Sequence, residues 1–306
     1  MRINTRTRVF GAVLVVFALV AAACGSGDDA SKTDGPTITI GSFGFSESEI
    51  VGEIYRLALE ADGYKVEHKA LLGSREAVVN PALRSGEINF VPEYIGTGLE
   101  VTFGIDPSAN ADETRDALDN AWAAENISVL DYTPAEDKNG IVVTAATAEK
   151  YNLAKISDLS TVAGELIFGG PPECPDRPRC LGGLGDVYGL TFGDFKALDV
   201  GGPLTVTALK GGEIDVALLF SSDGVIEAEG FVLLEDDKGL QPAENLAPIV
   251  ADSVLDAYGD GFTTLVNKVS AALNQADLTE LNKLVGYDGE DATEMARKWL
   301  TDNGLI

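Results

Sequence analysis

Hydrophobic and polar positions alternate between a strand pattern and a helix pattern from residue 37 onward. Residues 37–41, TITIG, are β-branched and end at a glycine, which predicts a strand. Residues 46–64 carry apolar side chains at helical spacing, and Ser46 with Glu49 has the form of a capping box that would start the helix. Strand, helix and strand patterns then follow over 64–72, 73–87 and 88–94. This βαβαβ order predicts an α/β fold.

The order of patterns restarts at residue 140. Residues 140–145 and 165–170 have strand patterns, and 203–224 has a helix, a turn and a strand in succession. Polar seams with Pro and Gly, at 133–140 and 234–245, bracket this middle unit. Two crossings between the units predict a two-lobe clamshell. Lobe 1 comprises residues 37–138 and 245–306, and lobe 2, residues 139–244, is inserted into it.

The N-terminal segment differs from the rest of the chain. Three arginines precede an apolar run over residues 9–23, and small residues stand directly before Cys24. This order predicts a secretory signal peptide over residues 1–23, with an N-terminal membrane anchor as the alternative. The segment looks like a bacterial lipoprotein signal, which implies a lipidated Cys24 and an extracytoplasmic, lipid-anchored protein. Residues 24–36 are small and polar and predict a flexible tether.

The composition is strongly acidic. The chain has 22 Lys and Arg against 49 Asp and Glu, a formal net charge of −27. Such a surface repels nucleic acid and anionic lipid head groups, so we expect no nucleic-acid partner. The charge does not by itself identify a cationic ligand.

Enzyme signatures are absent from the sequence. His68 is the only histidine, and its charged neighbours predict a solvent-facing side chain. The chain has no G-x-S-x-G and no phosphate-binding P-loop. We therefore expect neither catalysis, nor a cofactor, nor a metal.

Five motifs carry a resemblance to a known family. They are IGSFGFSESEIVGEIYRLALEADGYKV, NPALRSGEINFVPEYIGTGL, GGPPECPDRPRC, GGPLTVTALKGGEIDVALLFSSDG and LEDDKGLQPAENLAPIV. In this order they resemble the substrate-binding proteins of ABC importers for glycine betaine, choline and related osmoprotectants. The resemblance implies a type II periplasmic-binding-protein fold that traps a small quaternary-ammonium solute between two lobes and passes it to a membrane permease. A monomer fits this role. The alternative is an envelope lipoprotein of the same fold that binds another solute or a partner.

Aromatic side chains are the expected ligands of a quaternary ammonium, which has no hydrogen-bond donor and is held by cation–π attraction. Phe43, Phe45, Tyr94 and Phe220 follow predicted strands, where α/β sheets place ligands; packing in the core is the alternative for each. Tyr94 matches a tyrosine of the family's binding cage. Asn139 stands where several relatives carry another cage tyrosine, so the resemblance leaves one aromatic face missing.

Polar residues near the same loops are expected to hold the other end of the solute. Helix N-termini suit a carboxylate, which makes Ser42, Ser46, Ser74 and Thr97 candidate donors, with helix capping as the alternative for Ser46 and Ser74. Asp223 is a candidate for a hydroxyl or a cation, with a helix cap as the alternative.

Two cysteines remain once Cys24 is assigned to lipid. Cys174 and Cys180 lie six positions apart in a proline-rich loop. An oxidising compartment favours a disulfide, whereas a metal site would need further soft ligands and a redox motif would have C-x-x-C spacing. The sequence therefore predicts a structural disulfide at the lip of the cleft.

Overall fold

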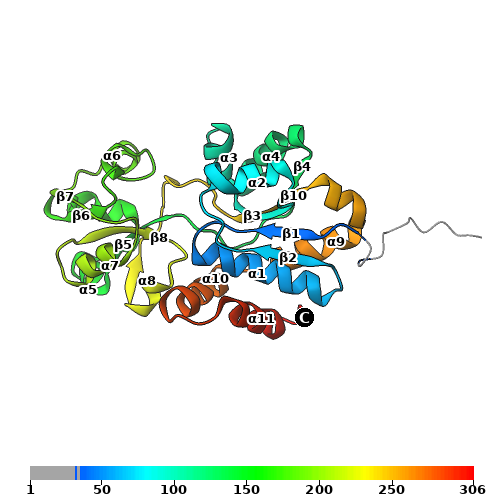
Figure 1. The fold of residues 1–306 in the computed structure, drawn as a ribbon. Helices are drawn as coiled ribbons and strands as arrows, with labels where there is room; N and C mark the ends of the chain where they lie inside the picture. Colours follow the sequence, from blue (N-terminus) through cyan, green and yellow to red (C-terminus); the bar gives the residue numbers. More distant parts are fainter. Residues whose placement is uncertain (1–31, 33–34) are drawn as a thin grey trace, which may run out of the picture.

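Two separate sheets build the molecule in the computed structural model, which describes Lys32 and residues 35–306. Residues 1–23, Cys24 and most of the 24–36 segment lie outside the described residues, so the signal peptide and the lipid site stay predictions. Figure 1 shows lobe 1, coloured from blue to bluish green together with the orange and red C-terminal segment, beside lobe 2, coloured green and yellow.

The sheet of lobe 1 has the strand order β2-β1-β3-β10-β4. Strands β1 and β2 are parallel, as are β1 and β3, whereas β10 runs antiparallel to β3 and β4. The bounds are β1 Ile38–Gly41, β2 Val66–Lys69, β3 Phe90–Tyr94, β4 Ile127–Val129 and β10 Leu246–Ala251.

The sheet of lobe 2 has the order β7-β6-β8-β5-β9. Strand β6 is parallel to β7 and β8, and β5 is antiparallel to β8 and β9. The bounds are β5 Asn139–Thr144, β6 Ile167–Gly170, β7 Asp194–Ala197, β8 Val216–Phe220 and β9 Phe231–Leu233. An α/β clamshell is thereby confirmed.

Helices cover both sheets, and each lobe has its own apolar core. In lobe 1, α1 packs on β1, β2 and β3 and contacts α9 and α11 (Figure 1). The lobe 1 helices are α1 Ser46–Ala61, α2 Asn80–Ser85, α3 Ile95–Phe103, α4 Ala111–Trp122, α9 Asp252–Ala272, α10 Gln275–Asn282 and α11 Ala292–Asp302, with short π-helical segments η1 Arg75–Val79 and η6 Lys283–Tyr287 and the 3-10 helix η2 Ala123–Glu125. The lobe 2 helices are α5 Ala145–Tyr151, α6 Leu181–Tyr188, α7 Pro203–Lys210 and α8 Gly224–Ala228, with short 3-10 helices η3 Ile156–Thr161, η4 Ala163–Glu165 and η5 Cys174–Asp176.

The start of α1 differs from the expectation. Phe45, not Ser46, is the N-cap residue, and no side chain caps the helix. Ser46 is the first residue inside the helix, so the Ser46–Glu49 capping box is wrong. The serine is left at the edge of the space between the lobes, where it lines the cavity described next.

Among the described residues, no helix combines the length and apolar character needed to cross a bilayer.

Candidate functional site

A cavity of about 1060 Å³ lies between the lobes and takes its walls from both. Lobe 1 contributes the start of α1, the end of β3 and the segment around α10 and η6. Lobe 2 contributes the end of β8, the start of α8 and the loop before α7. Because the carboxyl ends of strands from both sheets meet here, the cavity occupies the place where α/β folds bind ligands. The lining includes Phe45, Glu47, Arg75, Tyr94, Thr97, Asp137, Asn139, Arg179, Phe220, Ser222, Asp223, Glu244 and Asn282.

Three of the four expected aromatic residues line this cavity. The ring centroids of Phe45 and Tyr94 are 5.9 Å apart, and Phe45 keeps 45% of its surface exposed. Phe220 lines the opposite, lobe 2 wall. Phe43 is buried and does not line the cavity; its ring stacks on that of Phe45, with centroids 6.1 Å apart. It therefore supports the site from behind.

Three of the five expected polar residues line the cavity and two do not. Ser46, Thr97 and Asp223 line the cavity. The side chain of Asp223 does not cap α8; its Oδ2 accepts a hydrogen bond from Phe220 N at 2.9 Å, which fixes the loop that carries Phe220. Ser42 and Ser74 are not among the lining residues, and the Ser42 hydroxyl accepts from Leu71 N at 3.1 Å inside lobe 1.

Arg75 also lines the cavity. Its guanidinium makes a two-pronged contact with Glu93, with Nη2 2.8 Å and Nε 3.0 Å from the carboxylate oxygens. Its charged carbon also lies 4.5 Å from the Phe43 ring centroid. The side chain of Glu93 is 1% exposed, so this arginine is neutralised within lobe 1.

Buried carboxyl groups gather around the aromatic residues, and of these the sequence had singled out only Asp223. Glu47 accepts a hydrogen bond from the Tyr94 hydroxyl at 2.6 Å. Burial raises the pKa of Asp223 to about 6 and that of Glu244 to about 7, and burial with the nearby Glu47 charge holds the pKa of Asp137 well above its usual value. A cation entering the cavity would meet an environment that favours positive charge.

The lobes also touch directly at the rim of the cavity. The Tyr287 hydroxyl of lobe 1 donates to Glu229 of lobe 2 at 2.8 Å. Asn282 Nδ2 donates to the carbonyl oxygen of Ser222 at 2.9 Å. The cavity is therefore walled by both lobes.

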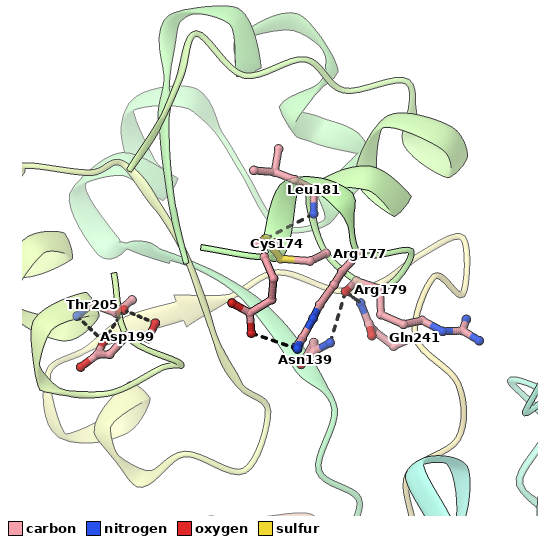
Figure 2. The surroundings of a disulfide bond; sticks show 10 residues. Asn139, Cys174, Arg177, Arg179, Leu181, Asp199, Thr205 and Gln241 are labelled. Atoms are coloured by element: carbon pink, nitrogen blue, oxygen red, sulfur yellow. Dashed lines mark hydrogen bonds and ion pairs between the residues drawn. A yellow bond between two sulfur atoms is a disulfide. The ribbon is translucent and has the colours of Figure 1, made fainter. Parts of the chain in front are cut away.

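The cysteine pair forms the expected disulfide. Cys174 and Cys180 are bonded, with their Cα atoms 5.2 Å apart, and both are buried in lobe 2 (Figure 2). Of the two arginines in the loop, Arg177 pairs with Glu173 on the exposed surface, with Nη2 2.9 Å from the carboxylate. Arg179 lines the cavity.

The prediction that the His68 side chain faces the solvent is wrong. Its side chain is 3% exposed, with Nδ1 2.7 Å from Glu53 and Nε2 3.1 Å from the Ser42 hydroxyl. Its strand neighbours Glu67 and Lys69 point to the opposite face of the sheet, whereas His68 lies on the face that α1 covers. The Ser42–His68–Glu53 chain has triad-like spacing, but Ser42 is fully buried and none of the three residues lines the interlobe cavity. It therefore has no access to a substrate there.

No grouping of three or more His, Cys, Asp or Glu side chains suited to a metal ion occurs in the described part of the chain.

Comparisons with known proteins agree with this geometry. A family model described as the substrate binding domain of ABC-type glycine betaine transport system matches residues 36–302. The chain is 28% identical to the glycine-betaine-binding protein of Pseudomonas aeruginosa over 93% of each chain, and 28% identical to the glycine betaine-binding protein YehZ of Escherichia coli over 87% of this chain and 90% of that one.

Solved structures agree as well. A glycine betaine/carnitine/choline ABC transporter structure superposes with a TM-score of 0.81 at 25% identity, covering 88% of this chain and 99% of that one. The ligand-free YehZ structure gives a TM-score of 0.76 at 28% identity, with the same coverage. The chain belongs to the family of substrate-binding domains of ABC-type glycine betaine transport systems.

Proposed function

We propose that this protein captures a small quaternary-ammonium solute, such as glycine betaine, carnitine or choline, between its two lobes and delivers it to the permease of an ABC importer. The observation that carries the proposal is the placement of Phe45, Tyr94 and Phe220 on the walls of one interlobe cavity. Aromatic faces hold a quaternary ammonium by cation–π attraction, and the carboxyl groups around them add favourable charge. Thr97 and Asp223 supply polar contacts in the same space.

Calorimetric titration of the purified protein with glycine betaine, carnitine and choline tests the capture. We expect dissociation constants in the micromolar range for at least one solute, with competition among those that bind. Absence of heat across the panel would contradict the proposal and would favour the alternative, an envelope protein of this fold with another solute or partner. Conversion of a bound solute to product would contradict a purely transporting role.

The proposed location follows from the N-terminal sequence. In this proposal Cys24 carries a lipid, which anchors the protein at the outer side of the cell membrane, close to its permease. The anchored protein works as a monomer. If Cys24 is lipidated, the protein should be found in the membrane fraction of cells and should incorporate labelled fatty acid. Both properties should be lost in a Cys24→Ser variant. Unlabelled wild-type protein would contradict the anchor and leave the capture of a solute untouched.

A further inference from the structure

Two carboxyl groups share one hydroxyl group where the lobes meet in the cavity. Ser222 Oγ lies 2.6 Å from Glu47 Oε2 and 2.6 Å from Asp137 Oδ1, so it is at hydrogen-bond distance from both. A hydroxyl has one hydrogen to donate, and an ionised carboxylate has none. The two short contacts are therefore satisfied together only when one of the carboxyl groups carries a proton.

Asp137 lies at the crossing between the lobes but is tied to lobe 2. Ser221 N donates to the carbonyl oxygen of Lys138 at 2.7 Å, and Lys138 N donates to Ser221 Oγ at 2.8 Å. These bonds fasten the segment that leads into β5 to the end of β8. Glu47 is bonded within lobe 1, where it accepts from the Tyr94 hydroxyl at 2.6 Å. Separation of the lobes would therefore keep Asp137 with lobe 2 and carry Glu47 away.

The charges that act on Asp137 are mainly negative. Burial and the charges of Glu47 and Asp223 hold its pKa well above the usual value, and the buried Tyr94 hydroxyl is a further neighbour. The basic groups that line the cavity or adjoin Asp137 are engaged elsewhere, namely Arg75 with Glu93, Lys138 with Glu136, Lys210 with Glu229 and Arg179 with the carbonyl oxygen of Leu240. Moving Glu47 away removes one negative charge, so the proton is held more tightly when the lobes are together than when they are apart.

A quaternary ammonium can take the place of that proton. Tyr94 offers its ring to the cavity and its hydroxyl to Glu47, so a cation on the ring would lie close to the carboxylate. A nearby opposite charge favours the ionised form of a carboxyl group. Binding of the cation therefore drives the shared proton into the solvent, and one positive charge serves the pair in either case.

We propose that a proton held by Glu47 and Asp137 through Ser222 closes the lobes of the solute-free protein, and that a captured quaternary ammonium displaces this proton into the solvent. Acid then favours the closed form without solute and opposes capture. This inference rests on the proposed capture of a quaternary-ammonium solute. It makes the junction between the lobes a pH-sensitive regulator of the same site.

Calorimetric titration of the wild type with choline and with glycine betaine between pH 5 and 9 tests the exchange. Neither solute changes its charge in this range, and repeating each titration in two buffers of different ionisation enthalpy counts the protons released. We expect a release approaching one proton per solute at the acid end and little release at the alkaline end. Because a ligand that displaces a proton gains affinity as the pH rises, the affinity should increase by up to about tenfold per pH unit where the release is complete.

Asp137→Asn removes the titrating group and keeps its shape. Its amide can donate to Ser222 without a proton from the solvent, so we expect this variant to release far fewer protons than the wild type. Glu136→Gln is the matched control. Glu136 is the adjacent acidic residue, pairs with Lys138 at 2.8 Å and does not line the cavity, so the control should release as many protons as the wild type.

Small-angle X-ray scattering of the solute-free protein tests the closure separately. We expect the wild type to become more compact as the pH falls from 9 to 5, and Asp137→Asn to be equally compact at both values. A radius of gyration of the wild type that does not depend on pH would overturn the closing role of the proton.

The outcomes separate this inference from the proposed function. Solute binding without proton release, and with the same affinity at pH 5 and 9, would overturn the exchange and leave the capture intact. Equal release by wild type and Asp137→Asn would place the proton on another carboxyl group of the cavity, such as Asp223 or Glu244, and would overturn the pairing. Binding of no solute at any pH would refute the proposed function and the inference with it. The wild-type measurements decide the proposal even if Asp137→Asn fails to fold.

Discussion

Ser222 of lobe 2 and Glu47 of lobe 1 meet across the cavity, with the serine Oγ 2.6 Å from the Glu47 Oε2. Asn282 lies beside them and donates through Nδ2 to the Ser222 carbonyl at 2.9 Å and to Glu47. These residues come from three distant parts of the sequence. Together they form a polar junction that only exists when the lobes are close.

The first prediction concerns the pH dependence of stability. Ser222 Oγ also lies 2.6 Å from Asp137 Oδ1, yet its hydroxyl has one hydrogen. Both carboxylates cannot accept it, so one carboxyl carries a proton. Burial, the Glu47 charge and the Asp223 charge raise the pKa of Asp137 well above its usual value, which points to Asp137 as the carboxyl that carries the proton.

A group with a raised pKa binds a proton in the folded state that the unfolded chain has released. The stability of the ligand-free protein should therefore fall as pH rises above the ordinary aspartate pKa. We expect Asp137→Asn to gain stability relative to wild type at pH 8 and to show little difference near pH 4, measured as unfolding midpoints. An equal difference at both pH values would contradict the shared proton.

The second prediction addresses the aromatic wall. Tyr94 offers its ring to the cavity and its hydroxyl to Glu47. Because a desolvated cation–π contact is worth about 2 kcal/mol, Tyr94→Ala should weaken binding of a quaternary ammonium roughly 30-fold. Tyr94→Phe keeps the ring and should weaken binding much less. Calorimetry distinguishes them, and equal losses in both variants would assign the effect to the hydroxyl instead.

A third prediction tests the contact between the lobes. A Cβ atom added at Gly224, at the start of α8, would lie 2.3 Å from the backbone N and Cα of Lys283 in lobe 1. The backbone cannot yield as a flexible side chain would, so Gly224→Ala should hold the lobes apart. We expect a larger radius of gyration in X-ray scattering and weaker solute binding.

Gly164→Ala is the matched control, since the nearest atom to an added Cβ there, the carbonyl oxygen of Thr191, is 4.0 Å away. It should change neither the scattering nor the affinity. Scattering of Gly224→Ala that matches wild type would show that the junction adjusts without opening.

The fourth prediction concerns the buried histidine network of lobe 1. Burial alone would raise the pKa of Glu53, but hydrogen bonds from His68, Arg56 and Thr293 outweigh it and lower the pKa to about 2. A lowered pKa contributes stability above the unfolded value, and this contribution is lost as pH falls through the folded value. Glu53→Gln should therefore destabilise the protein by about 2 kcal/mol at pH 7, which is less than the full pKa shift implies because solvent screens part of the interaction. The difference should shrink between pH 4.5 and 2.

Denaturant unfolding at several pH values measures this effect. Glu60→Gln is the comparison, because Glu60 pairs with Arg56 in a more exposed position and should change stability by less than about 0.5 kcal/mol. A Glu53→Gln penalty that does not vary with pH would mean that lost packing, not charge, is responsible.

Local patterns predicted most of the fold. The β-branched run at 37–41 became β1, the helical spacing after it became α1, and the helix, turn and strand over 203–224 became α7 and β8. The short strands β4 and β7, of 3 and 4 residues, were not predicted. The disulfide prediction from the cysteine spacing, and the expectation of an acidic surface from the net charge, required no knowledge of the fold.

What the sequence determined by itself is therefore the α/β class, the clamshell, the family and the aromatic residues at strand ends, since these follow from periodicity and motifs. Only the tertiary structure decided which side chains meet. Phe43 and Ser42 lie behind the cavity, and His68 is buried beneath α1. Glu47, Ser222 and Asn282 meet in space although Glu47 and Asn282 are 235 positions apart in the sequence. Burial and charge pairing depend on such distant neighbours, and a linear pattern contains no information about the distance between them.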